Sequence, residues 1–381
     1  MITPETVKRL AASTDEHCLT LYLNTGPGLP RNAYVTRFHT LLRELNSRVP
    51  VQARREYEAA VDRVSRWLEQ LQPRGNSCLV YAGERSLEDF SSRVPVRDEV
   101  HWGRPDVSQL LWLLEEYRPY GLLIADREHV RFLAVRLGEF ECCEEFAADI
   151  DTADWRRRVI GSAGRGPAVQ KGGVDSRAFE NRYAEQIRRF WRSLHRPLTE
   201  LIERYHVRRL VVAANKSRLP EFAASLPTDL AAAVVVRMTL DASTSFTSPS
   251  EAVQRIYPAI EAWEEDHDRR LVHTLLDAAS FGNRAAVGIV PVLKYLQDGR
   301  AARLVVAKTL DRSVFECGDC GYVTSEQVDC PVCSKSSFRK TNLTFALARL
   351  TAQAKVPFDI VKRAPAEELI RNSGLGAFLR Y

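Results

Sequence analysis

Short apolar runs alternate with amphipathic segments along the whole chain. Residues 18–23, 77–82 and 209–214 are nearly continuous apolar runs, which are typical of buried strands. Residues 33–48 and 52–71 instead place apolar side chains three and four positions apart, which predicts two helices that each bury one face. Because helices and strands alternate in this way, the sequence predicts a mixed α/β (α+β) fold.

The same pattern, over a chain of 381 residues, predicts three domains. The first is an αβ domain over residues 1–118, and the second is an α/β domain over residues 119–247. The third, over residues 248–381, is an α/β domain with a cysteine-rich insert at 315–336.

In the second domain, residues 175–205 have helical spacing, and Pro197 is expected to interrupt or bend this helix. Further elements are predicted near residues 90–96, 106–116, 121–126, 130–137, 220–226, 232–238, 249–281, 291–298, 303–307, 342–354 and 357–361.

Composition agrees with a globular protein, since 45% of the residues are hydrophobic and 27% are charged. No apolar run approaches the roughly 18–20 residues that cross a bilayer, and the N-terminal stretch lacks the apolar segment of a secretion signal. We therefore expect a cytoplasmic protein without a membrane partner.

Positive charge is concentrated in one segment. The whole chain carries a net charge of only +5, but residues 156–209 contain 14 Lys and Arg against 5 Asp and Glu. Within this segment, residues 161–173 are rich in glycine and include Arg165 and Lys171. Such a loop can bring its backbone close to phosphate groups.

The predicted helix that follows combines arginines with aromatic side chains. Phosphate-binding guanidinium groups and rings offered for stacking are how RNA is commonly held. The alternative is a solvated helix face whose aromatic residues belong to the core, and the helical spacing favours that for most of the rings. The residues concerned are Arg177, Arg182, Arg188, Arg189, Arg192 and Arg196, with Tyr183, Phe190 and Trp191.

Four of the eight cysteines form two C-x₂-C pairs, with nine residues between the pairs. This spacing predicts a closed Cys₄ shell around a structural Zn²⁺ ion, in a zinc ribbon whose small polar insert lacks a core of its own. A redox pair or spare thiols are the alternative, and a Cys₄ site also suits iron. The predicted ligands are Cys317, Cys320, Cys330 and Cys333.

Sequence signatures of catalysis are weak. No nucleophile elbow, Walker A loop or HExxH motif occurs. Asp126, Glu128, Asp149 and Asp151 are candidate Mg²⁺ ligands of a nuclease, but Asp is also favoured in the hairpin turn predicted around 127–129. We expect a protein that is not an enzyme.

Several segments, in this order along the chain, resemble the bacterial branch of the archaeo-eukaryotic release factor and Pelota family, which includes ribosome-hibernation proteins of the Balon type. The Cys₄ ribbon and the terminal LIRNSGLGAFLRY are the most specific matches. The others are LTLYLNTGP, YGLLIADREHVRFLAVRLGEFE, the Gly-Gly loop with its basic helix and VRRLVVAAN, and VPVLKYLQDGRAARLVVAK.

The resemblance implies a three-domain, tRNA-shaped protein that occupies the ribosomal A site. In such relatives the first domain faces the decoding centre and the middle domain points a loop at the peptidyl-transferase centre. The third domain, with its zinc ribbon, meets the stalk base or a translational GTPase. Partners implied for this chain are therefore the rRNA of both subunits of the bacterial ribosome, with elongation factor Tu or another translational GTPase.

One departure from the family affects the expected activity. Release factors carry Gly-Gly-Gln, but here Gly172 and Gly173 are followed by Val174, whose side chain has no group that can orient water. Gln170 lies just upstream and would need an altered loop to substitute for the missing glutamine. A stop-codon-reading Asn-Ile-Lys-Ser motif is also absent.

The sequence therefore predicts a non-catalytic A-site factor that acts in ribosome hibernation, a stress response. Rescue or peptidyl-tRNA hydrolysis is one alternative, and RNA binding unconnected to ribosomes is another. The predicted rRNA contacts are Arg165, Lys171, Gly172 and Gly173 near the peptidyl-transferase centre, and Arg31 and Arg37 in the decoding region.

Overall fold

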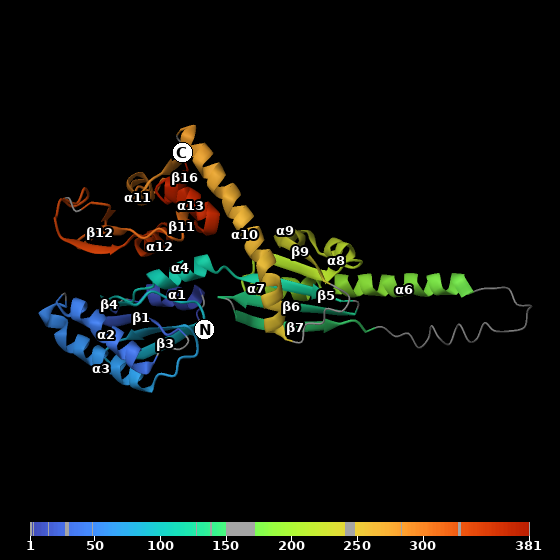
Figure 1. Ribbon diagram of the computed structural model, residues 1–381, viewed down its shortest axis with the longest axis horizontal. Coiled ribbons are helices and arrows are strands. Elements are labelled where there is room, and N and C mark those ends of the chain that lie inside the picture. The colour runs from blue at the N-terminus through green and yellow to red at the C-terminus, as the bar shows by residue number, and fades with distance from the viewer. Residues whose placement is uncertain are drawn as a thin grey trace, which may run out of the picture. The chain divides into compact units, whose positions relative to one another are not determined.

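The computed structural model describes the chain except at residues 1, 3, 14, 27–29, 48, 127, 138, 150–171, 241–247, 283, 327–328 and 381. Two compact units are present (Figure 1). One joins Met1–Arg118 to Glu264–Tyr381, and the other is Pro119–Trp263. Helices and sheets occur in both units, so the predicted mixed α/β class is confirmed. The division into three domains stays a prediction.

The N-terminal part of the first unit is an antiparallel sheet in the order β3-β2-β1-β4. Helices α2 and α3 pack against it because their apolar sides, which include Phe38 and Val64, are fully buried against strand residues such as Leu21. The elements are α1 (Pro4–Ala11), β1 (Cys18–Asn24), α2 (Arg31–Asn46), η1 (Val51–Ala53), α3 (Arg54–Gln70), β2 (Ser77–Ala82), β3 (Leu87–Ser92), β4 (Glu99–Gly103) and α4 (Ser108–Glu116).

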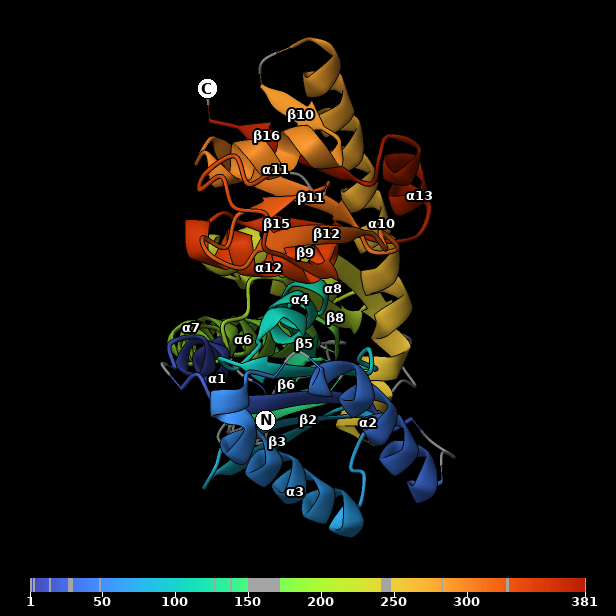
Figure 2. The ribbon, with the colours of Figure 1, turned by 90° about the vertical axis from the view of Figure 1, so that its left-hand side faces the viewer.

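The C-terminal part of this unit contains a second sheet in the order β10-β16-β11-β15, in which only β11 and β15 are parallel (Figure 2). Helix α10 approaches it closely at Gly376, where an added Cβ would lie 2.4 Å from Leu275 Cδ2. Helix α10 (Pro249–Ser280) belongs to this unit from Glu264 onward, and its earlier residues belong to the second unit. The other elements are β10 (Ala285–Val287), α11 (Ile289–Gln297), β11 (Ala301–Ala307), α12 (Leu343–Ala354), β15 (Phe358–Val361), α13 (Arg363–Arg371) and β16 (Leu375–Leu379).

Helix α4 joins the two parts of the first unit. Its Trp112 belongs to the hydrophobic core of the C-terminal part, where its ring lies 6.1 Å from that of Phe358. The helix packs against α12 and β15. A segment of the N-terminal part thus completes the core of the C-terminal part.

Buried charges reinforce this junction. The Glu116 side chain is 5% exposed and pairs with Lys308 Nζ at 2.6 Å. Asp359 is 8% exposed and pairs with Arg303 and with Arg118 Nη1, the latter at 3.1 Å. Burial alone would raise the pKa of Asp359, but the guanidinium groups of Arg303 and Arg118 lower it below its ordinary value. Removing one partner of such a pair would leave an uncompensated buried charge.

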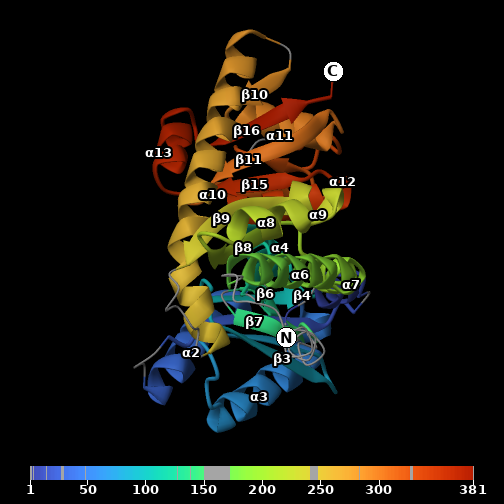
Figure 3. The ribbon, with the colours of Figure 1, turned by 90° about the vertical axis from the view of Figure 1, so that its right-hand side faces the viewer.

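The second unit is a five-stranded sheet in the order β7-β6-β5-β8-β9 (Figure 3). Strands β7, β6 and β5 are antiparallel, and β5, β8 and β9 are parallel. The elements are β5 (Tyr120–Ala125), β6 (His129–Arg136), β7 (Glu139–Ala147), α6 (Gly172–Ser193), α7 (His195–Arg204), β8 (Leu210–Asn215), α8 (Leu219–Ser225), α9 (Thr228–Ala233) and β9 (Val234–Leu240).

Helices cover both faces of this sheet. Neighbouring strand residues point to opposite sides, so Leu123 packs with α6 to α9 whereas Leu122 packs with the first half of α10. Both leucines are fully buried. This two-sided burial explains why the strands are almost continuously apolar in the sequence.

Some predicted boundaries change. The long basic helix breaks at Leu194 and not at Pro197, which lies in the first turn of α7, where a missing N–H removes no helical hydrogen bond. Outside the cysteine insert, the elements that were not predicted include α1, β4, β7, α9, β10, α13 and β16. Within the residues that the structure describes, every helix is too short or too polar to cross a bilayer.

The role of Trp112 is testable by substitution. We expect Trp112→Ala to lower the free energy of unfolding of the first unit by about 3–5 kcal/mol, because it leaves a cavity in the C-terminal core. Hydrogen exchange measured by mass spectrometry should show faster exchange in β11 and β15, with the second unit unchanged.

Trp191→Ala is the matched control, because this ring is 1% exposed and lies in the core of the second unit. This variant should show faster hydrogen exchange in the second unit, with β11 and β15 unchanged. Unchanged exchange in β11 and β15 of the Trp112 variant would contradict the role assigned to α4.

Candidate functional site

The predicted cysteine insert forms a small antiparallel sheet in the order β13-β12-β14. Its strands are β12 (Ser313–Cys317), β13 (Val323–Thr324) and β14 (Phe338–Asn342). Because Cys317 ends β12, the first cysteine pair follows directly from a hydrogen-bonded strand.

The two cysteine pairs converge. The four Sγ atoms of Cys317, Cys320, Cys330 and Cys333 all lie within 4.8 Å of one another. The Sγ atoms of Cys317 and Cys333 are 3.5 Å apart, and those of Cys320 and Cys330 are 3.4 Å apart. Both separations are too long for a disulfide. They are close to the edge of about 3.8 Å that a tetrahedron of Zn–S bonds of about 2.3 Å would have.

Each cysteine pair is held by the same turn. Gly321 N–H donates to Cys317 O at 2.9 Å, and Ser334 N–H donates to Cys330 O at 2.8 Å. Gly321 and Ser334 both have positive φ, at 75° and 57°. Glycine adopts this conformation without strain, which accounts for Gly321 after the first pair.

Backbone N–H groups point at all four sulfur atoms. At Cys320 and Cys333, burial and hydrogen bonds with the neighbouring thiols outweigh them and raise the pKa. At the other two thiols the pKa is lowered. The N–H groups of Cys320 and Asp319 lower the pKa of the Cys317 thiol. Burial raises the pKa of Cys330, but the N–H groups of Cys333 and Val332 outweigh it and lower the pKa to about 7. Metal binding requires deprotonated thiols, so this donor set fits a zinc ion held by four thiolates.

The ribbon is attached to the C-terminal part by side chains outside the cysteine pairs. The Gln297 side chain forms two hydrogen bonds to the backbone of Val323, of 2.9 and 2.8 Å. Glu316, next to Cys317, is buried and pairs with Arg349 and with Arg339 Nη2, the latter at 2.8 Å. The sequence did not indicate these residues, because no local pattern links a glutamine on α11 or an arginine on α12 to a distant insert.

The second candidate site is the outer side of α6 and α7. Their inner side packs on the sheet, where Ile187, Trp191 and Leu194 are almost fully buried. The Trp191 ring lies 5.4 Å from Phe222. The interpretation of the aromatic residues as core is therefore confirmed for Trp191, while Tyr183 and Phe190 are partly buried against the same core.

The arginines of these helices lie on the exposed side. Arg188 and Arg189 pair with Glu185, and Arg196 pairs with Glu200 one turn away. Exposed pairs of this kind contribute little to stability, so a phosphate group can replace the carboxylate at small cost. We call this surface the arginine face; its residues are Arg182, Arg188, Arg189, Arg192 and Arg196.

The structure places only some of the predicted rRNA-contact residues. Arg165 and Lys171 lie outside the described residues. Gly172 and Gly173 are the first two residues of α6, the helix that carries most of the arginine face. Arg31 is the first residue of α2.

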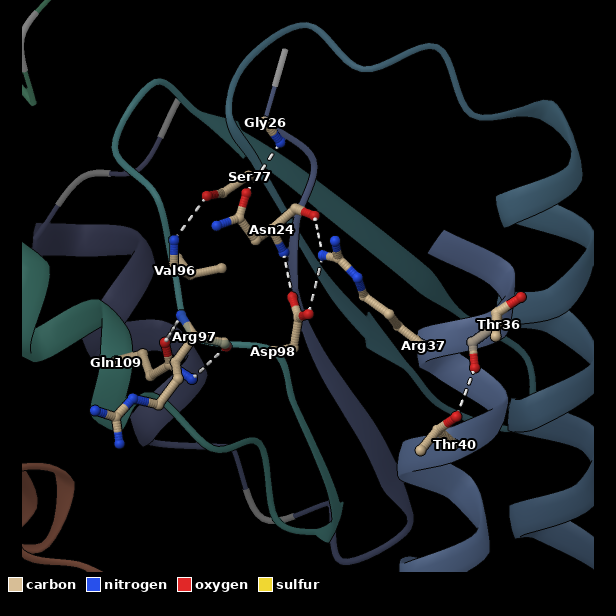
Figure 4. A network of polar contacts seen from close by, with 10 residues as sticks. All are labelled: Asn24, Gly26, Thr36, Arg37, Thr40, Ser77, Val96, Arg97, Asp98 and Gln109. Carbon is tan, nitrogen blue, oxygen red and sulfur yellow. Dashed lines mark hydrogen bonds and ion pairs between the residues drawn. The ribbon is translucent and has the colours of Figure 1, made fainter. Parts of the chain in front are cut away.

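Arg37 has an internal partner that the sequence did not indicate (Figure 4). Its Nη1 donates to Asn24 O at 3.2 Å and pairs with Asp98 Oδ2 at 3.1 Å. Asp98 Oδ1 also accepts from Asn24 N–H at 2.6 Å, and the Arg37 side chain remains 34% exposed. Arg37 thus ties α2 to the end of β1, and its contact with RNA stays a prediction.

The chain is similar to release factors over its middle part. Residues 105–261 match the model of a family described as "Bacterial archaeo-eukaryotic release factor family 10". The match covers fewer than half of the residues, so it relates this middle segment to release factors, a translation-related class, and leaves the rest of the chain outside the match. The particular family that the segment is similar to is family 10 of the bacterial group. No curated protein matches the chain.

Solved structures of the same class also match. An archaeal translation termination factor, aRF1, is 15% identical with a TM-score of 0.25, and the match covers 100% of this chain and 99% of that one. Ribosome-bound archaeal Pelota is 13% identical with a TM-score of 0.44, covering 81% and 72%. S. cerevisiae Dom34 is 10% identical with a TM-score of 0.37, covering 80% and 81%. These TM-scores are low, so the similarity to release factors depends on the sequence match over residues 105–261.

The metal centre is testable by elemental analysis. We expect the purified protein to hold about one zinc ion per chain, and Cys330→Ser to lose most of it because three thiolates leave the shell open. Cys143→Ser is the control, since Cys143 is exposed and lies outside the cluster. A chelator should accelerate hydrogen exchange in β12 and β14, because an insert of this kind folds around its metal. Metal-free protein with a protected ribbon would instead favour spare or redox-active thiols.

Proposed function

We propose that this protein is a ribosome-binding factor that occupies the A site of the bacterial ribosome without hydrolysing peptidyl-tRNA. The observation that carries the proposal is the arginine face, which lies in the segment that matches the release-factor family, on helices that begin at Gly172 and Gly173.

The charge distribution on this face suits rRNA. Arg182 and Arg192 are exposed, and among the described side chains they form no ion pair. Arg189 is 74% exposed, and Arg196 is 90% exposed. Arginines bind phosphate groups through several N–H donors. Because α6 is about 33 Å long, it can lie along several consecutive phosphate groups of an RNA strand. The glycine-rich loop before the helix, with Arg165 and Lys171, would extend the contact toward the peptidyl-transferase centre.

The residue after the glycine pair supports a role without catalysis. Val174 has neither a donor nor an acceptor in its side chain, so it cannot place the water that hydrolyses the ester. An A-site occupant without this chemistry blocks tRNA entry, which is the property of a hibernation factor. This role belongs to the stress response and places the protein in the cytoplasm.

Delivery by a translational GTPase such as elongation factor Tu is part of the same proposal. The Cys₄ ribbon, with structural zinc, would face this partner or the stalk base. Arg31 and Arg37 would lie toward the decoding region, with Asp98 positioning Arg37.

Co-sedimentation with purified bacterial ribosomes tests the site of binding. Vacant ribosomes should bind the protein, and prior occupation of the A site by tRNA should abolish binding. Binding that tRNA does not affect would contradict the A-site assignment. Binding to free RNA with none to ribosomes would favour an RNA-binding role outside translation.

Charge removal on the arginine face tests the surface. Arg182→Ala with Arg189→Ala should weaken ribosome binding and flatten its logarithmic salt dependence by about 0.7–0.9 for each phosphate group that the variant no longer binds. Arg255→Ala is the control, because Arg255 is exposed on α10 of the same unit and lies outside the arginine face. An unchanged slope in the double variant would remove this surface from the proposal.

A peptide-release assay distinguishes the non-catalytic role from the alternative role of a peptidyl-tRNA hydrolase. Ribosomes that carry peptidyl-tRNA should retain their peptide when the protein is added. Peptide release that disappears in Gln170→Ala would show instead a hydrolase with a displaced glutamine.

A further inference from the structure

An open pocket of about 410 Å³ lies between α10 and the C-terminal sheet, and none of its lining residues belongs to the ribbon or the arginine face. Four of its lining residues follow one side of α10, and two lie on neighbouring strands. They are His267, Arg270, Leu271 and Thr274 on the helix, Arg303 on β11 and Phe378 on β16.

The fold brings these residues together in a defined way. Arg303 and Phe378 are paired directly across β11 and β16, so their side chains share one face of the sheet. On α10 the lining residues are three or four positions apart and form one stripe. The helix touches the sheet one turn further on, where Leu275 packs against Gly376.

The pocket combines positive charge with an apolar surface. Asp359 accepts a hydrogen bond from Arg303 Nε and thereby fixes that guanidinium group on the sheet. Arg270 is 67% exposed and pairs with Asp266 at 3.1 Å, an exposed contact that another carboxylate can replace at small cost. Leu271 and Phe378 are half-buried, and none of the described residues that line the pocket is acidic.

The surroundings indicate which kind of ligand fits. Because Arg270 and Thr274 are exposed, a small molecule would leave much of its surface in water, whereas a chain segment would also cover the rim. An RNA strand carries a phosphate at every nucleotide and would meet the exposed or half-buried carboxylates of α10 that neighbour the lining residues in the sequence. These are Glu264, Glu265, Asp266 and Asp277, whereas Asp268 is buried. A protein segment can place one acidic side chain in the pocket and neutral or basic ones beside it.

We propose that this pocket binds a short protein segment that has an acidic side chain next to an aliphatic or aromatic one. The carboxylate lies against Arg270 and Arg303, and the apolar side chain rests on Leu271 and Phe378. This site is independent of rRNA binding, and its failure would leave the proposed A-site role unaffected.

A random peptide library displayed on phage, selected on the immobilised full-length protein, provides the probe. We expect the enriched peptides to share an acidic residue adjacent to an apolar one. Fluorescence anisotropy with a labelled copy of the most enriched peptide then measures affinity for each variant. Absence of enrichment, or enrichment without acidic residues, would overturn the proposal.

Two variants and one control locate the site. Arg270→Glu should weaken peptide binding about tenfold or more, because it brings like charges together at the contact. Thr274→Trp should also abolish binding by filling the pocket while keeping both guanidinium groups. Arg269→Glu is the matched control, since the adjacent Arg269 is 55% exposed and does not line the pocket. It pairs with Glu265 and shares Asp266 with Arg270. This control variant should bind as the wild type does.

Two further results would count against peptide binding in this pocket. Equal binding by Arg270→Glu and the wild type would contradict the proposal. So would a short oligouridylate that displaces the peptide and itself loses binding in Arg270→Glu, because the pocket would then be an RNA contact. Circular dichroism melts of the three variants should match the wild type, since the substituted side chains are exposed.

Discussion

The burial of Ile187, Trp191 and Leu194 against the five-stranded sheet decides which side of α6 and α7 meets the solvent. Helical periodicity then leaves the arginines no inward position, so they form a continuous exposed face. The position of the Gly172–Gly173 pair follows from the same packing, because it begins the helix that the sheet holds. The RNA-binding role proposed for this unit therefore depends on the apolar contact between its helices and its sheet.

The ribbon, in contrast, is held by polar contacts and not by an apolar core. Its strands are short and its residues largely polar, so it has little apolar surface to bury. The two similar turns at Gly321 and Ser334 aim backbone N–H groups at the sulfur atoms. The contacts of Glu316 and Gln297 join the insert to the C-terminal part of the first unit. A metal ion at the cysteine cluster would take the place of a hydrophobic core.

Local patterns in the sequence predicted the elements that bury an apolar stripe or run, such as α2, α3 and β8. The missed elements lack that signal: β7 is rich in glutamate at the edge of its sheet, and β16 becomes a strand by pairing with β10 and β11, which are distant in the chain. The cysteine cluster was predictable because its spacing is local. The insertion of Trp112 into the C-terminal core and the Arg37–Asp98 pair were not, since both join residues that only the fold brings together.

The most direct test of A-site binding through the arginine face is an electron cryomicroscopy structure of the protein bound to vacant bacterial ribosomes. We expect density in the A site, with Arg182, Arg189 and Arg192 of α6 within hydrogen-bonding distance of rRNA phosphates. Density at another ribosomal site, or an A-site complex in which α6 faces solvent, would contradict it.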